Sequence, residues 1–158
     1  MAKKKIDLGM IATLCAAVLG VIAIIMLALP AFSAGEKLVF EYSCWEAVFG
    51  DSDELFKFSF MNFLTFALVI AGIVCTVLNF LGKGGKYMNL IATVAFLIAG
   101  IFFFLTIAFS VINVPEGTSA ETIKNMKEQF KLGAGAIIGG ICSILAAVAS
   151  GYKAFIAK

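Results

Sequence analysis

The feature that most constrains this chain is the spacing of its charged residues. Four runs without Asp, Glu, Lys or Arg, of 28, 25, 29 and 21 residues, separate Asp7 from Glu36, Lys57 from Lys83, Lys86 from Glu116 and Lys131 from Lys153. A helix needs about 20 apolar residues to cross the hydrocarbon core of a bilayer, so each run is long enough for one crossing. The segments between the runs are too short to bury a core of their own.

The sequence therefore predicts an all-α integral membrane protein, a bundle of four transmembrane helices in a single domain over residues 1–158. The expected helices cover about 8–32, 57–82, 87–113 and 119–157. The first apolar stretch, residues 8–29, is longer than the roughly 7–15 residues of a signal-peptide core, so we interpret it as a span. Three glycines in Gly82–Lys86 predict a tight turn that makes the second and third helices antiparallel neighbours.

The lysines predict the orientation of the bundle. Residues 1–7, 83–86 and 153–158 carry seven of the twelve lysines, although they are far shorter than the two segments that hold the other five. Because cytoplasmic loops are enriched in basic residues, both termini are expected inside the cell and the segments 36–57 and 116–131 outside. The use of Lys without Arg is typical of an AT-rich bacterial genome.

The first outer segment has a strand-like alternation. Its two alternating sets are Leu38, Phe40, Tyr42 and Cys44 on one side and Val39, Glu41, Ser43 and Trp45 on the other. This strand could pair with residues 47–49, or it could offer its edge to another copy. The alternative is an irregular or helical loop whose rings lie at the headgroup level. Asp51, with Glu54 three residues later, predicts the start of the second span.

The second outer segment predicts a helix that continues into the membrane. Thr118 and Glu121 have the spacing of a capping box, and the helix is expected to run from about Ser119 through the fourth span, with its first turns outside the membrane. Three apolar residues, Ile123, Met126 and Phe130, share one face of it. The alternative is that these turns lie flat on the lipid surface.

Small residues form stripes on two of the predicted spans. On the fourth span they are Gly135, Gly139, Ser143, Ala147 and Gly151, and on the first span they are Ala12, Ala16 and Gly20. Small residues let helix backbones approach closely in lipid, so these stripes predict helix packing and assembly. Phenylalanines of the second and third spans lie at the depth of the outer glycines, and they could belong to the same copy or to a neighbouring one.

The composition excludes several chemistries. The chain has no His, its net charge is +2, and no Asp, Glu, Lys or Arg lies inside the four runs. We therefore expect no enzyme activity, no cofactor, no nucleic-acid binding and no proton-coupled transport. No metal site is predicted, because Asp51, Asp53 and Glu54 lack the spacing of a calcium loop. Polar residues such as Asn62, Thr106 and Ser110 suit hydrogen bonds between helices, or a narrow wet pathway.

The layout of the chain resembles the tetraspan architecture of claudins. The shared features are four spans, inner termini, a larger and strand-like first outer segment that contains Cys44 and Trp45, and a long fourth helix. Claudins carry a disulfide-bonded cysteine pair in that segment, whereas here Cys44 has no second cysteine beside it. The resemblance implies lateral self-association and contact between neighbours at the outer face. Cys44 could link two copies or stay reduced beside Trp45.

The sequence thus predicts a structural or interaction protein of the plasma membrane that associates with itself or scaffolds a membrane complex. The residues expected to make outer-face contacts are Phe40, Tyr42, Cys44, Trp45, Ile123, Met126 and Phe130. The alternative is a passive pore of several copies. The acids at its mouth would be Glu41, Glu46, Asp51, Asp53 and Glu54.

Overall fold

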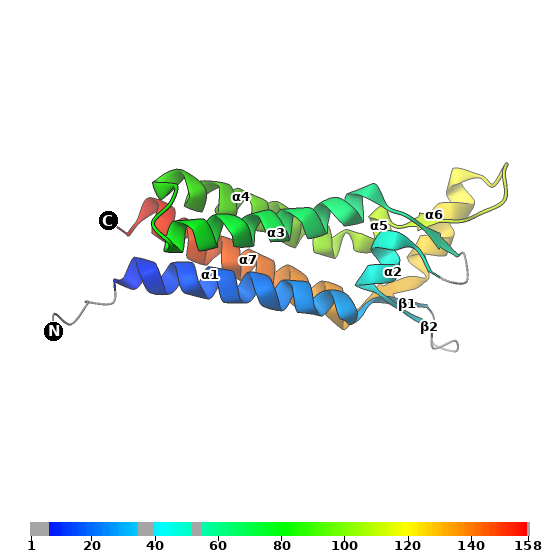
Figure 1. The fold of residues 1–158 in the computed structure, drawn as a ribbon. Helices are drawn as coiled ribbons and strands as arrows, with labels where there is room; N and C mark the ends of the chain where they lie inside the picture. Colours follow the sequence, from blue (N-terminus) through cyan, green and yellow to red (C-terminus); the bar gives the residue numbers. More distant parts are fainter. Residues whose placement is uncertain (1–6, 35–39, 52–54, 158) are drawn as a thin grey trace.

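The structure is a computed structural model that describes residues 7–34, 40–51 and 55–157. Four long helices run side by side (Figure 1). They are α1 (Leu8–Ile25), α3 (Phe60–Phe80), α4 (Gly85–Phe104) and α7 (Ala134–Phe155). Each is long and apolar enough to cross a membrane, α1 together with the 3₁₀ turn η1 (Met26–Ala28) that continues it. The four predicted spans are therefore confirmed as helices of spanning length.

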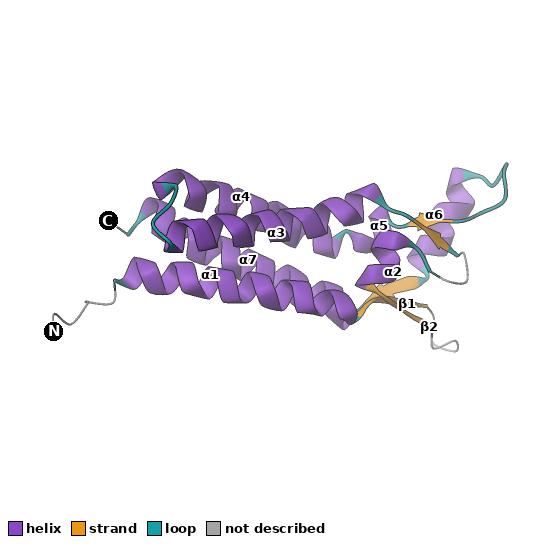
Figure 2. Ribbon diagram, in the orientation of Figure 1, coloured by secondary structure: helices purple, strands orange, loops and turns teal. Residues whose placement is uncertain are grey.

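The two ends of the bundle differ. Both chain ends and the α3–α4 turn lie at one end, here the terminal end, and all strands described lie at the other, here the cap (Figures 1 and 2). α1 packs against α3 and α7, and α4 packs against the same two helices. The cap consists of β1 (Pro30–Ala34), β2 (Phe40–Ser43), α2 (Cys44–Phe49), β3 (Phe56–Lys57), α5 (Thr106–Phe109), β4 (Val111–Ile112), α6 (Ala120–Glu128) and β5 (Phe130–Leu132).

The turn at the terminal end has the predicted glycine geometry. Gly82, Gly84 and Gly85 have φ of 75°, 99° and 56°, in the left-handed region that glycine adopts without strain. The Asn79 amide Nδ2 donates to the carbonyl oxygen of Gly85 over 2.7 Å and ties the two sides of the turn together. The antiparallel α3–α4 hairpin is confirmed.

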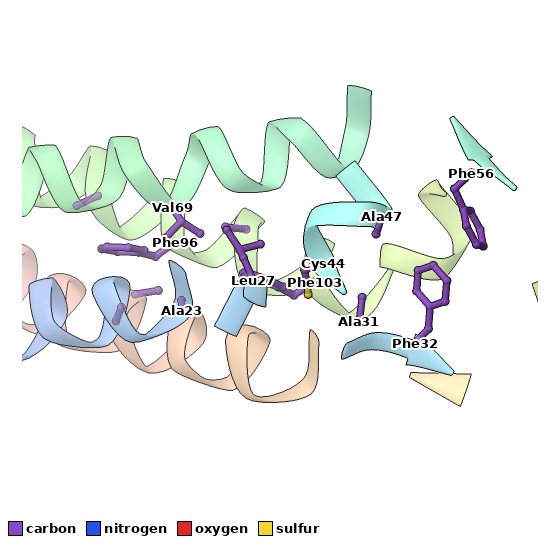
Figure 3. Packing of buried hydrophobic residues seen from close by; sticks show 14 of the residues in the cluster. Ala23, Leu27, Ala31, Phe32, Cys44, Ala47, Phe56, Val69, Phe96 and Phe103 are labelled. Atoms are coloured by element: carbon purple, nitrogen blue, oxygen red, sulfur yellow. The ribbon is translucent and has the colours of Figure 1, made fainter. Parts of the chain in front are cut away.

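Two phenylalanines of α4 fill the space between the helices. Phe96 is fully buried, and its ring lies so close to Gly20 of α1 and Gly72 of α3 that a Cβ at either glycine would fall 2.9 Å or less from a ring atom. Phe103, two turns later on the same face of α4, lies against Gly139 of α7 in the same way. Figure 3 shows both rings inside the bundle. Large rings beside glycines therefore give the interior its close packing.

The first span ends earlier than the sequence predicted. We expected it to continue to about residue 32, but α1 and η1 end at Ala28, and Leu29 is already extended. Pro30 follows, and a residue before proline is pushed out of the helical region. Residues 30–34 form β1 instead, which changes the end of the first span into the central strand of a sheet.

The small sheet has the order β2–β1–β5 with antiparallel pairs on both sides of β1. Phe32 is paired with Tyr42 of β2 and with Leu132 of β5. The predicted strand is confirmed over Phe40–Ser43, whereas Leu38 and Val39 lie outside the described residues. The predicted pairing with residues 47–49 is wrong, because those residues belong to α2.

The second and third spans are shorter than predicted. α3 begins at Phe60, where the hydroxyl of Ser59 accepts from the backbone N–H of Asn62, so the predicted cap at Asp51 is wrong. Asp51 accepts instead from the backbone N–H of Phe56 at 2.9 Å. α4 ends at Phe104 rather than near residue 113, and β4 turns back to pair with β3.

The predicted continuous helix from 119 to 157 is wrong. α6 ends at Glu128, β5 pairs with β1, and α7 begins only at Ala134. Gly133 donates its N–H to the carbonyl of Ala31 at 2.6 Å, so pairing with the sheet replaces helical hydrogen bonds at this point. Glycine is also a weak helix former, which makes Gly133 a low-cost position for the break.

The predicted capping box at Thr118 is also wrong. The N-cap of α6 is Ser119, whose hydroxyl accepts from the backbone N–H of Thr122. The Thr118 hydroxyl donates instead to the carbonyl of Pro115 at 2.7 Å. Thr118 and Ser119 both carry a hydroxyl that can cap a helix. The capping-box spacing predicted Thr118, whereas the N-cap is Ser119.

Candidate functional site

One group of aromatic rings forms the interior of the cap. This cap core consists of Phe32 of β1, Tyr42 of β2, Phe56 of β3 and Phe130 of β5, with ring centroids 4.8 to 6.3 Å apart. Phe32 is 1% exposed, and Figure 3 shows its ring facing that of Phe56. Tyr42 and Phe130, which the sequence suggested as contact residues, therefore pack within the copy.

A second group of rings lies on the outside of the molecule. This aromatic surface consists of Trp45 and Phe49 of α2, Phe58 after β3 and Phe63 of α3, with neighbouring centroids 5.3 to 6.4 Å apart. Trp45 and Phe49 are stacked with an interplanar angle of 20°. The side chains are 42%, 50%, 50% and 36% exposed, in chain order. They form a contiguous apolar surface that extends from the cap onto the first turn of α3.

Helix α2 separates the two groups of rings. Ser43 and Glu46 form a capping box at its start, with the Glu46 carboxylate accepting from the Ser43 backbone N–H and the Ser43 hydroxyl accepting from the Glu46 N–H. Trp45 and Phe49 are four residues apart and share the outer side of the helix. Cys44, Ala47 and Val48 are buried on the inner side.

Cys44 does not reach the surface. It is 3% exposed, and burial in apolar surroundings raises the pKa of its thiol to about 12. A thiol with such a pKa stays protonated at neutral pH and reacts slowly. The Cys44 sulfur is therefore not accessible for the predicted outer-face contact or for a disulfide between copies in this structure.

The small-residue stripe of the fourth span lies inside the bundle over most of its length. Gly135, Gly139, Ser143 and Ala147 are buried, and Gly151 is half-buried. A Cβ at Gly135 would lie 2.7 Å from the carbonyl oxygens of Met26 and Leu29, and at Gly139 2.9 Å from the Phe103 ring. At Gly151 the nearest atom would be 3.5 Å away, an ordinary contact. The stripe is therefore close-packed toward the cap and looser toward the terminal end.

The shorter stripe on the first span is graded in the same way. Gly20 and Ala16 are buried, and Ala12 is half-buried. Gly20 meets Ile73 of α3 in addition to the ring of Phe96. Gly20 and Gly139 thus contact rings of the same copy, which is the arrangement of the intramolecular alternative.

Polar groups inside the bundle bind each other across helices. The Asn62 amide donates to the Ala47 carbonyl at 2.9 Å and to the Thr106 carbonyl and the Ser110 hydroxyl at 3.3 Å. A cavity beside this network, between Leu27 and Phe103, measures only about 10 Å³. That is about the smallest volume that holds one water. The predicted hydrogen bonds between helices are confirmed.

The acids suggested for a pore mouth have different surroundings. Glu46 caps α2 and Asp51 binds the backbone of Phe56, while Glu41 is exposed. Asp53 and Glu54 lie outside the described residues. No group of three or more His, Cys, Asp or Glu that could hold a metal ion occurs in residues 7–34, 40–51 and 55–157.

A groove of about 530 Å³ lies between α6 and the segment where α4 passes into α5. Ile123 of α6 faces it, whereas Met126 packs against the hydrophobic core. Lys127 lies in its wall and donates from Nζ to the Ala108 carbonyl at 2.7 Å. Burial lowers the pKa of the Lys127 ammonium. Nothing in the hydropathy pattern had indicated this groove.

A smaller pocket of about 350 Å³ lies at the terminal end between the α3–α4 turn and the end of α7. Asn79, Lys86, Asn89 and Lys153 line it. Lys153 pairs with Asp7 at 3.3 Å. The backbone N–H of Gly9, then the Lys153 ammonium, lower the pKa of the exposed Asp7 carboxyl. This ion pair joins the two ends of the described chain.

Comparison with known proteins identifies no relative of this chain. No family model matches the sequence, and neither the curated proteins nor the solved structures contain a match. The function of this chain is therefore inferred from its own geometry. The sequence signal for the aromatic surface was present in Ser43 and Glu46, whose spacing is that of a capping box and predicts a helix with Trp45 and Phe49 on one side.

Proposed function

We propose that this protein is a structural or interaction protein of the plasma membrane that associates laterally with further copies, or scaffolds a membrane complex, through its aromatic surface. The supporting observation is the exposure of Trp45, Phe49, Phe58 and Phe63 in one contiguous group. Aromatic side chains are enriched where protein interfaces carry most of their binding energy.

The position of the aromatic surface supports a protein partner in addition to lipid. Rings that only anchor a helix lie at the headgroup level around the span. Here the exposed rings of Trp45, Phe49, Phe58 and Phe63 form one contiguous group, with neighbouring centroids 5.3 to 6.4 Å apart. Self-association through one surface patch is satisfied by a two-fold symmetric pair, in which the patch of each copy contacts the other.

We place the cap outside the cell and the terminal end inside, following the lysine distribution. The resemblance to claudins implies contact between neighbours at the outer face. Glu41 is exposed in the cap and suits a topology test better than the buried Cys44. A Glu41→Cys variant should react with a membrane-impermeant thiol reagent on intact cells, and reaction only after lysis would reverse the orientation.

The mass of the purified particle tests the proposed association. In mild detergent, the wild-type protein should form a dimer or larger oligomer as its concentration rises. Trp45→Ala with Phe49→Ala should weaken this association by at least about tenfold, because truncating a central interface ring typically costs 2 kcal/mol or more. Light scattering coupled to size-exclusion chromatography measures both species.

The matched control removes two exposed rings from the other end of the molecule. Phe80 and Phe155 are 43% and 66% exposed, and Phe80→Ala with Phe155→Ala should leave the oligomer intact. A wild-type protein that stays monomeric at every concentration would refute self-association. Equal weakening by both double variants would assign the effect to general loss of apolar surface.

The passive pore is the alternative function. A single copy would not form it through the Asn62 network, where the cavity is about 10 Å³, so several copies would have to enclose a path between them. Exposed Glu41 would then favour cations at the mouth. Purified protein in liposomes should give a conductance that falls in Glu41→Gln, and electrically silent liposomes would remove this alternative.

A further inference from the structure

The groove beside α6 continues the lipid-facing side of α4. Exposed apolar residues recur along that helix at spacings of three and four, and they are Ile91, Val94, Leu97, Ile101 and Phe104. Phe104 and the following Leu105 also line the groove. An acyl chain that lies along α4 therefore meets the groove without crossing a polar barrier.

The opposite wall of the groove belongs to the cap. Ala120 and Ile123 of α6 supply its apolar part, and Lys127 lies one turn beyond Ile123. α6 lies outside the spanning segments, so this wall lies where a bilayer changes from hydrocarbon to headgroups. The groove thus offers an apolar floor at the membrane edge and a cation above it.

The charges of the groove leave one cation without a carboxylate. Lys124 pairs with Glu128 at 3.9 Å, whereas Lys127 has no acidic partner among the described side chains. The Lys127 ammonium uses one N–H on the Ala108 carbonyl and has two more to donate. Its charge is partly desolvated, which lowers its pKa and makes a nearby anion favourable.

We propose that this groove binds one anionic phospholipid, with the phosphate on the Lys127 ammonium and an acyl chain against Phe104, Leu105 and Ile123. The apolar floor holds the chain and the ammonium selects the headgroup. An anionic lipid is favoured over a zwitterionic one because Lys124 and Glu128 pair with each other, which leaves the Lys127 ammonium as the groove cation without a carboxylate.

Lipid retention by the full-length protein tests the proposal. The protein is purified in detergent with equal amounts of phosphatidylglycerol and phosphatidylcholine of matched chains, and bound lipid is counted by native mass spectrometry. The wild type should retain one phosphatidylglycerol in preference to phosphatidylcholine, and Lys127→Gln should reduce that preference by about tenfold, the value of a hydrogen bond to a charged group. Higher salt should weaken the preference in the wild type.

The matched control is Lys124→Gln, which removes the same charge one turn earlier on α6 from a side chain that is already paired and well exposed. It should keep the preference for phosphatidylglycerol. Ile123→Trp keeps both lysines and fills the apolar wall, so it should lose both lipids. If Lys127→Gln lowers the unfolding temperature in lipid-free detergent, Ile123→Trp still tests whether the groove binds lipid.

Three results would overturn the lipid site. They are equal retention of both lipids by the wild type, equal loss in Lys127→Gln and Lys124→Gln, and a second protein copy cross-linked into the groove in place of lipid. The groove and the aromatic surface share no residue, so an oligomer that persists while lipid preference disappears separates this site from the proposed association.

Discussion

The cap holds two groups of aromatic rings with similar spacing and different exposure. In the cap core, Phe32 is 1% exposed and its neighbours come from other strands. In the aromatic surface, Phe58 is 50% exposed and its ring neighbours are Phe49 and Phe63. The distances between rings therefore do not distinguish a cluster that stabilises the fold from a cluster that is available to a partner.

The difference follows from the elements that carry the rings. β1 is the central strand between β2 and β5, and Phe32 meets rings of both strands and the Phe56 ring of β3 in the second sheet, so the cluster joins segments far apart in the sequence. α2 is a short helix that turns Cys44 inward while Trp45 and Phe49 point outward. Aromatic residues on a central strand are expected to contribute to stability, and those on the outer side of a short helix to recognition.

The largest effect that tests this contrast is the loss of a cap-core ring. Phe32→Ala should lower the free energy of unfolding by about 3–5 kcal/mol, because the buried ring leaves a cavity among three other rings. Phe58→Ala, which removes the same side chain from the aromatic surface, should lower it by less than about 1 kcal/mol. Denaturation in mixed detergent micelles measures both values, and equal losses would show that the two groups share one role.

The same contrast between enclosed and open sites can be tested among the glycines of α7. Gly139→Ala should destabilise the protein by about 1–3 kcal/mol, because its Cβ would lie 2.9 Å from the Phe103 ring. Gly151→Ala should be neutral or stabilising by up to about 1 kcal/mol, since its Cβ has ordinary contacts and alanine favours the helix. A uniform loss at both positions would mean that the whole stripe is close-packed, as the sequence alone suggested.

The sequence predicted the features that depend on neighbouring residues. Long apolar runs between charges gave the four helices, and Gly82, Gly84 and Gly85 gave the turn between α3 and α4. The small residues of α7 predicted close packing, and Gly135 and Gly139 lie close to backbone and ring atoms of other elements, whereas Gly151 does not. These features need only local conformation and hydrophobicity, which can be read along the chain.

The errors lie where distant segments compete with local preference. Residues 30–32 were predicted as the end of the first span, but they belong to β1, which pairs with β2 and β5, and the same pairing interrupts the predicted helix at Phe130–Leu132. The groove of α6 likewise needs two segments to meet. The capping box at Ser43 and Glu46 is an error of another kind, because its two residues are close in the sequence. The alternation of apolar and polar residues around it predicted a strand instead of a helix.

Cys44 offers the smallest and most direct test of the boundary between the two groups of rings. Its thiol lies on the inner side of α2, one residue before exposed Trp45. Because burial raises the pKa from 9.0 to about 12, the unfolded chain loses this proton near pH 9 while the folded protein keeps it. The protonated Cys44 thiol therefore contributes to the free energy of unfolding in full below pH 9, and this contribution is lost as pH rises toward 12. Linkage makes the free energy of unfolding about 1 kcal/mol smaller at pH 10 than below pH 9.

The measurement compares the wild type with Cys44→Ala, which leaves every other side chain unchanged. The free energy of unfolding should fall more steeply with pH in the wild type between pH 9 and 11. At pH 7 a small maleimide should modify Cys44 only after the protein is unfolded, and Trp45→Cys in the Cys44→Ala background should react in the folded state. Rapid modification of folded Cys44 would place that thiol on the same surface as Trp45, and the division of the cap into an interior and an exposed face at α2 would then be wrong.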